Sequence, residues 1–317
     1  MGITHLEVHL RGKKVYVPSA QVENRTIVAK GRWLKMAMVH DEELVEGEIV
    51  RDPESFAHKL KESGLGADIF TFSQKPPHTA PRHSYQMEWD NWAVIPITTY
   101  SEWFKKRAES SVQRAVRKAA KSGVVVSLAE FDDAFVSGIV GIHDESPVRQ
   151  GMPFWHFRES FEDVKRDYST YSERNVFVAA YYQDEMIGFI RMTYADKVAH
   201  IIQILSKIEH LDKRTSNALI AKAVEVCEQQ GISYLVYCNY VYKDPKSSLT
   251  EFKRRNGFEA MLLPRYYIPL TLKGKLALGL GVHRGLAARI PKSVVSQLLK
   301  IRSMWYDLRF KAAKETA

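Results

Sequence analysis

The stretch that decides the fold is residues 175–207, NVFVAAYYQDEMIGFIRMTYADKVAHIIQILSK. Three runs rich in β-branched and aromatic residues are separated by short polar turns at 183–185 and 195–197. Such turns favour antiparallel strands, because a parallel return needs a crossover of a dozen or more residues. The stretch therefore predicts a three-stranded antiparallel meander.

Periodic patterns on both sides extend this meander. Leu219, Ala223 and Cys227 share one helical face and precede Gly231, which predicts a helix capped by Thr215 or Ser216. Before the meander, the pattern predicts a helix over 99–122 with a Thr99–Glu102 capping box, a strand over 124–131, and helices over 131–146 and 158–171. After the helix that ends at Gly231, it predicts a strand over 232–240, a helix that begins with a Ser248–Glu251 capping box, and a last strand over 260–270.

The first hundred residues are different in character. Hairpin patterns around Gly12 and Lys30-Gly31 predict strand pairs, a short helix fits 53–64, and the proline-rich stretch 75–85 predicts a loop. The chain is thus expected to have a strand-rich part (1–98), a second domain (99–272) and a basic amphipathic helical tail (273–317).

The order helix, three antiparallel strands, helix, strand, helix, strand resembles the GNAT acyltransferases. VQRAVRKAAKSGVVV (112–126) and SSLTEFKRRNGFE (247–259) resemble the FemAB-like branch, which includes peptidoglycan aminoacyltransferases. This resemblance implies an α+β fold (α/β by some schemes), with a mixed, mostly antiparallel sheet flanked by helices and two GNAT-like halves.

The resemblance also implies a donor site. In a GNAT domain the fourth and fifth strands diverge, their backbone groups bind the pantetheine arm of acyl-CoA, and the next helix offers its N-terminus to the pyrophosphate. The stretch KRTSNALIAKA (213–223) keeps a basic start but lacks the two glycines of the usual phosphate loop, so acyl-CoA of the acetyl-CoA type and aminoacyl-tRNA both remain open as donors. Solvated cations beside a helix cap would explain the same residue types. The donor-binding candidates are Leu205, Ser206, Lys213, Arg214, Thr215, Ser216 and Asn217.

Catalysis is expected at the ends of the same two strands. Acyl transfer to an amine needs a base for its proton and an acid for the leaving group. The family pattern implies Glu209 after the fourth strand and Tyr240 or Tyr242 after the fifth, with His200 and Gln203 inside the fourth strand. No Ser or Cys has a nucleophile's setting, so direct transfer without an acyl-enzyme is expected.

A loop punctuated by Pro and Gly supplies candidate acceptor-binding residues. Loops with many polar groups often line sites, although aromatic residues anchoring a surface loop would explain the same pattern. His143 and His156 have no third ligand at metal-site spacing, so no metal site is predicted. The candidates are His143, Glu145, Arg149, Gln150, Trp155 and His156.

Charge is concentrated at the C-terminal end. The net charge is +9, and residues 273–317 hold ten Lys/Arg against Asp307 and Glu315. An amphipathic stripe from Val294 to Leu308 indicates an anchor on an anionic membrane surface or a helix that packs on the body. The sequence has two cysteines, no export signal and no apolar run long enough to span a bilayer, which predicts a cytoplasmic protein. If the tail binds lipid, the protein is expected to be peripheral at the inner face of the membrane.

Together these features predict an N-acyltransferase that moves an acyl group from acetyl-CoA or a similar donor to an amine, on a sugar or a cell-envelope precursor. Two alternatives stay open: an aminoacyl-tRNA-dependent aminoacyltransferase, and a non-catalytic GNAT-like protein that binds an envelope or polysaccharide partner. The expected partners are an amine-bearing small molecule or glycan precursor, tRNA if it is the donor, and no DNA.

Overall fold

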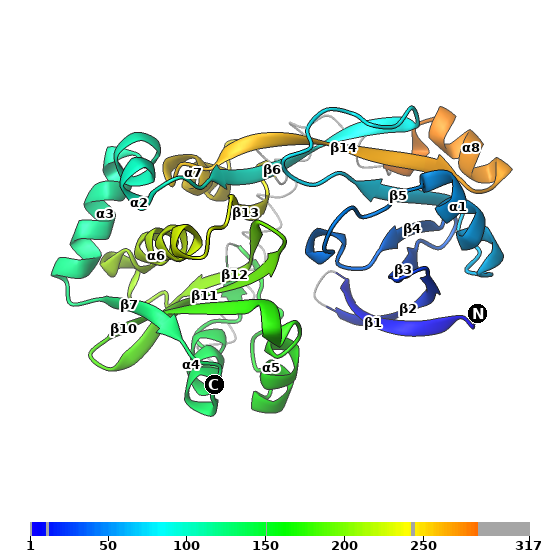
Figure 1. Ribbon diagram of the computed structural model, residues 1–317. Coiled ribbons are helices and arrows are strands. Elements are labelled where there is room, and N and C mark those ends of the chain that lie inside the picture. Colours follow the sequence, from blue (N-terminus) through cyan, green and yellow to red (C-terminus); the bar gives the residue numbers. More distant parts are fainter. Residues whose placement is uncertain (1, 11–12, 150, 242–244, 285–317) are drawn as a thin grey trace. The chain divides into compact units, whose positions relative to one another are not determined.

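The computed structural model describes residues 2–10, 13–149, 151–241 and 245–284 of the 317-residue chain (Figure 1). In this part of the chain, twelve strands follow the hydrogen-bonded order β1-β2-β3-β4-β5-β14-β6-β13-β12-β11-β10-β7. Two neighbouring pairs, β4–β5 and β12–β13, are parallel within this mostly antiparallel order. The predicted fold class, a mixed and mostly antiparallel sheet flanked by helices, is confirmed.

The described residues divide into two compact units. One contains the residues up to Asp90, residues 151–155 and those from Leu262 to Arg284, and the other contains 91–149 and 156–261. The boundaries predicted at residues 98 and 272 separate the two GNAT-like halves and the tail, which is a different division from these compact units, and they stay a prediction. The first unit draws on β1 (Thr4–Leu10), β2 (Lys13–Val22), β3 (Arg25–Lys30), β4 (Met36–Val39), η1 (Glu42–Leu44), α1 (Pro53–Glu62), β5 (Ile69–Ser73), β9 (Met152–Pro153), α8 (Leu272–Gly279) and η5 (Val282–Arg284).

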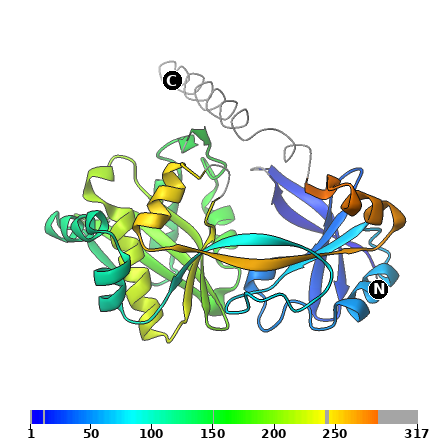
Figure 2. The same ribbon diagram turned by 90° about the horizontal axis from the view of Figure 1, so that it is seen from above.

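The second unit holds the predicted meander. Its elements are α2 (Tyr100–Glu102), the π-helix η2 (Trp103–Arg107), α3 (Ser110–Lys121), β7 (Val125–Ala129), α4 (Asp133–His143), β8 (Val148–Arg149), α5 (Phe161–Tyr168), η3 (Ser172–Arg174), β10 (Asn175–Tyr182), β11 (Glu185–Ala195), β12 (Val198–Ser206), η4 (Leu211–Lys213), α6 (Thr215–Gln229), β13 (Tyr234–Asn239) and α7 (Ser248–Arg255). Two long strands, β6 (Gln86–Pro96) and β14 (Glu259–Pro269), contribute residues to both units and run side by side (Figure 2).

The meander is confirmed, with β10–β11 and β11–β12 antiparallel. Alternate residues of β10 enter two different cores, as expected for a strand covered on both faces. Val178 and Ala180 pack with α6, whereas Phe177 and Ala179 pack with α4. In Figure 1, α3 and α6 lie over one face of β10–β12, and α4 and α5 lie over the other.

The first unit has its own core. Phe56 and Leu60 of α1 are almost completely buried with Phe70 of β5, whose ring stacks on Phe56 at 5.1 Å between centroids. β14 pairs antiparallel with β5, and its Tyr266 belongs to the same core. The last strand of the predicted second domain therefore completes the sheet of the first unit.

Some predicted helix limits are wrong in detail. The helix expected over 99–122 is broken, because η2 ends at an extended Ala108 and α3 begins only at Ser110. Thr99 does accept the N–H of Glu102 as expected, whereas α7 is capped by Ser247, one residue before the predicted Ser248. The amphipathic stripe of the predicted tail lies outside the described residues.

In residues 2–284, with the gaps given above, no helix combines the length and the apolar character that crossing a bilayer requires.

Candidate functional site

The candidate site lies where β12 and β13 diverge. The two strands pair in parallel only over three positions, and the last of these joins His200 to Val236. Beyond it, β12 continues to Ser206 along β11, while Asn239 of β13 is opposite Trp92 of β6. A bulge at Ile202 adds one residue to β12 at this point. This is the divergence that the family resemblance implies for the fourth and fifth strands.

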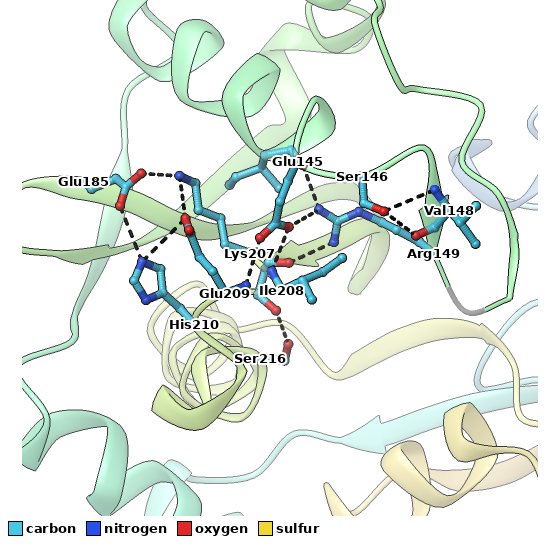
Figure 3. Close-up of polar contacts among 12 residues, drawn as sticks. Glu145, Ser146, Val148, Arg149, Glu185, Lys207, Ile208, Glu209, His210 and Ser216 are labelled. Carbon is cyan, nitrogen blue, oxygen red and sulfur yellow. Dashed lines mark hydrogen bonds and ion pairs between the residues drawn. The ribbon is translucent and has the colours of Figure 1, made fainter. Parts of the chain in front are cut away.

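Two side chains from the segment after α4 bind the end of β12 (Figure 3). The Glu145 carboxylate accepts the backbone N–H groups of Ile208 at 2.7 Å and Glu209 at 2.9 Å. Arg149 donates to the carbonyl of Ser206 at 2.9 Å and forms an ion pair with Glu145 at 3.0 Å. Both side chains are mostly buried, with 16% and 12% exposure. The pair therefore holds the backbone from Ser206 to Glu209 in place.

The bound backbone groups lie on the edge of β12 that faces away from β11. The N–H of Lys207 donates to Ile187 of β11, and successive backbone groups in a strand point to opposite edges. The carbonyl of Ser206 and the N–H of Ile208 therefore point to the other edge, where Arg149 and Glu145 bind them. These are the positions at which a strand-like donor arm would be expected to bind.

The predicted phosphate loop leads directly into α6. Arg214 occupies the N-cap with a left-handed backbone (φ 61°), and no side chain caps the helix within this described segment. The predicted capping by Thr215 or Ser216 is therefore wrong. Thr215 is buried, the Ser216 hydroxyl lies 3.0 Å from that of Ser206, and Asn217 donates to Asn256 at 3.1 Å. The first backbone N–H groups of α6 supply the positive end of the helix dipole here.

The two predicted loop cations behave differently. Arg214 is exposed, whereas the Lys213 ammonium lies 4.5 Å above the ring of Tyr182. Residues of η4, which includes Lys213, also contact α3. The loop thus lies close to α3. There, a shallow cavity of about 320 Å³ is lined by Arg114, Arg117, Lys118, Lys121 and Ser122.

In the described part of the chain, the predicted catalytic residues do not form one cluster of contacting side chains. His200 is buried at the point of divergence, with its ring edge-on to Trp92 at 5.6 Å, and Gln203 is half-buried beyond the bulge. Glu209 is exposed and pairs with Lys207 at 3.2 Å. Tyr240 is half-buried, and its backbone N–H donates to Asn91 at 2.7 Å. Tyr242 lies outside the described residues.

Lys253 is a candidate that sequence reasoning missed. It is only 1% exposed, and its ammonium donates to the carbonyl of Asn239, the last residue of β13, at 2.6 Å. The ammonium also lies 4.5 Å above the ring of Tyr237, and burial lowers the pKa of Lys253. Among the described residues its ammonium has no ion pair with a carboxylate, so no acidic side chain neutralises this buried charge. The sequence holds no signal that separates it from its neighbours: Thr250, Lys253 and Asn256 share one face of the α7 segment by their spacing, but only the fold shows that this face is buried.

The acceptor-loop candidates fall into two groups. Glu145 and Arg149 form the pair at the end of β12. His143, at the end of α4, lies against His156, with ring centroids 4.6 Å apart. Trp155 is exposed, and Gln150 lies outside the described residues. The predicted acceptor-binding residues therefore lie in two separate places, at the end of β12 and around His143, and do not line one site.

Comparison with known proteins supports the family resemblance. Residues 143–258 match the acetyltransferase (GNAT) family model. The structure of FemX covers 87% of this chain and 90% of its own length, with a TM-score of 0.57 and 11% identity. L-PGS of Bacillus licheniformis covers 83% of this chain and 87% of its own, with a TM-score of 0.54 and 13% identity. A comparison with curated protein sequences finds no match.

The class defined by fold and site is therefore a GNAT-fold protein. The resemblance to the GNAT family, predicted from 175–270, is confirmed by the family match over 143–258. FemX and L-PGS share the fold, in line with the likeness to the FemAB-like branch predicted from 112–126 and 247–259. At identities this low, the two structures show a shared fold.

Proposed function

We propose that this protein is an N-acyltransferase that transfers an acyl group directly from its donor to an amine on a sugar or cell-envelope precursor. The observation that carries the proposal is the divergence of β12 and β13, with the buried Lys253 at the end of β13 and the free helix start of α6 after β12. Such an arrangement offers positive charge to an acyl carbonyl on one side and to donor phosphates on the other.

The chemistry requires a tetrahedral intermediate. The amine nitrogen attacks the acyl carbon, the carbonyl oxygen becomes an oxyanion, and the bond to the leaving group breaks while a proton passes from the amine to that group. The ammonium of Lys253 would stabilise the oxyanion, because a charge held in a buried setting needs little reorganisation. Tyr240, which directly follows β13, is our candidate for the proton donor to the leaving group.

The end of β12 favours an aminoacyl-tRNA donor over acyl-CoA. Glu145 and Arg149 bind the backbone groups of Ser206 and Ile208 that a pantetheine arm would pair with. An aminoacyl ester has no pantetheine and does not need this edge. The basic face of α3, close to the loop that carries Lys213 and Arg214, would attract the phosphates of an RNA backbone. The likeness to FemX and L-PGS over most of the chain agrees with this choice.

Acyl-CoA remains the second candidate donor, because the start of α6 carries no side-chain cap and would accept a pyrophosphate. A thermal-shift panel with acetyl-CoA, CoA, charged tRNA and uncharged tRNA separates the two. A ligand present at a hundred times its Kd adds about 2.7 kcal/mol of stability. We expect stabilisation by charged tRNA, weakening as salt rises, and none by acetyl-CoA. No response to either donor would favour the non-catalytic alternative.

Acetyl-CoA binding by a double variant tests whether Glu145 and Arg149 exclude a pantetheine arm from the β12 edge. In a Glu145→Ala/Arg149→Ala variant the edge is vacated, so acetyl-CoA should bind more tightly than it does to the wild-type protein. Isothermal titration with acetyl-CoA measures the change, and a Lys207→Ala variant, which alters the neighbouring ion pair but not the edge, is the control. Tight acetyl-CoA binding by the wild-type protein would show that the pair does not exclude the donor arm.

A further inference from the structure

A second cluster of chemically competent side chains lies on the α4 side of the sheet. The Glu159 carboxylate is 2.7 Å from Nδ1 of His156 and 3.6 Å from Nδ1 of His143. The candidate ligand atoms of these three residues all lie within 4.8 Å of one another. His143 has no exposed side-chain surface, and the other two are 11% and 13% exposed. The cluster is thus a partly enclosed site rather than a surface arrangement.

Surrounding groups orient the first imidazole. The Tyr168 hydroxyl is 3.2 Å from Nε2 of His143, so its partner nitrogen, Nδ1, is the one directed at Glu159. A histidine whose second nitrogen is held by a hydrogen bond has the tautomer and ring orientation that metal ligation uses.

The backbone fixes the other two ligands. Residues 156–159 form a turn in which the N–H of Glu159 donates to the carbonyl of His156 at 3.2 Å. The N–H of Arg158, which has a left-handed backbone, donates to the carboxylate of Asp144 at 2.9 Å. This second bond ties the turn to the residue after His143. Both sides of the cluster are therefore held together before any ligand binds.

We propose that His143, His156 and Glu159 bind a divalent transition-metal ion of the zinc type. Two imidazoles and one carboxylate form a ligand set that zinc accepts, with a fourth position left for water or another oxygen. Bonds of about 2.0–2.1 Å in tetrahedral geometry place ligand atoms about 3.3 Å apart, and the two measured separations lie on either side of that value. In the sequence the two histidines have no third ligand at metal-site spacing, whereas the fold brings the carboxylate of Glu159 beside both.

A second three-residue cluster in the described chain makes a useful contrast. Glu185, Glu209 and His210 also have ligand atoms within 4.8 Å of one another. The ammonium of Lys207 already lies between these carboxylates and pairs with both. Both glutamates are about half exposed. The Lys207 ammonium therefore already occupies the position between the two carboxylates and offsets one of their two charges, and we assign the metal to the buried cluster.

The proposed ion would act on the candidate site by position. It would join the end of α4 to the turn that precedes α5, and Glu145 follows His143 by only two residues. Holding this segment in place would support the Glu145–Arg149 contacts with the end of β12. The role assigned to the metal is structural, and it applies whichever donor the protein uses.

Cobalt titration of the untagged, metal-stripped protein tests the assignment. We expect about one Co²⁺ per chain with visible d–d absorption of a low-coordinate nitrogen and oxygen site, displaced by equimolar Zn²⁺. His156→Gln and Glu159→Gln should each weaken binding on the order of 100-fold, since each removes a ligand. His210→Gln, the matched change in the exposed cluster, should leave the affinity unaltered.

Two results would overturn the proposal. One is the absence of a cobalt spectrum and of retained zinc in the wild-type protein. The other is wild-type affinity in both His156→Gln and Glu159→Gln, or a loss confined to His210→Gln. Because His143 is buried, it is left unchanged in these variants. Circular dichroism of each variant shows that it is folded, and the wild-type cobalt spectrum decides the question even if one variant is not.

Discussion

Replacing Lys253 by Met gives the sharpest test of the proposed chemistry. The change keeps an unbranched side chain of similar length and removes the ammonium that lies at the end of β13. If this charge stabilises the oxyanion, its loss should cost about 2.7–4 kcal/mol of transition-state stabilisation, or about 10²–10³-fold in kcat. The donor KM should change little, because the charge would act mainly in the transition state.

The fold should tolerate this substitution. The variant loses a charge-assisted hydrogen bond worth about 1.5–3 kcal/mol, and the Asn239 carbonyl is left to find another partner. Burying a Met removes the cost of desolvating an ammonium, which offsets part of that loss. We expect the free energy of unfolding to fall by about 2 kcal/mol or less, measured by urea denaturation.

The assay measures single-turnover transfer from the donor identified in the binding panel. The loss of acyl donor over time is the measured signal. Lys222→Met, on α6 with a surface ion pair to Glu225, is the matched control and should have wild-type kcat. The pH profile adds a second measurement. Burial lowers the pKa of Lys253, so the wild-type rate should fall as pH rises through that pKa, whereas the Met variant should lack this decline. A folded Lys253→Met protein with a kcat within about threefold of wild type would refute the reasoning.

Three further predictions concern stability and the tail. Gly188→Ala should destabilise the second unit by about 1–3 kcal/mol, because a new Cβ would lie 2.8 Å from Thr215 of α6. Gly141→Ala, in a helix and with open space around the new Cβ, should raise the free energy of unfolding by about 0.5–1 kcal/mol, and urea denaturation measures both changes. Burial raises the pKa of Glu43 to about 7, so the folded state binds more protons than the unfolded state between pH 4.5 and 7, and stability should fall by a few kcal/mol as pH rises through this window. Glu43→Gln should remove that dependence, and an unchanged pH profile would contradict the buried setting. Full-length protein should sediment with anionic liposomes at low salt, because each basic residue near the surface contributes about 1 kcal/mol of binding free energy. A chain ending at Arg284 should stay in the supernatant. The cut is placed there because Ala277 and Leu278 of α8 pack in the first unit, and unfolding of the shortened chain would place the tail in the core instead.

Local pattern was enough to identify the meander and its helices. Alternation over 175–207 and the helical spacing of Leu219, Ala223 and Cys227 depend on contacts that every strand or helix of that composition makes. Glycines that end α3 and α6, Gly123 and Gly231, have the positive φ that the sequence indicated. Their lack of a Cβ makes them the favoured residues there, whatever the rest of the chain does.

Tertiary structure decided which polar residues become functional candidates. In the sequence, Lys253 lies in EFKRR and has the same local signal as its solvated neighbours, and only the packing of α7 beside β13 buries it. Glu145 reaches backbone groups more than sixty residues away, and Glu159 joins two histidines that no periodicity connects. A hydrophobic pattern specifies which face of an element is buried, but not which other element covers it. Partners that are distant in the sequence are therefore fixed only when the sheet and its helices assemble.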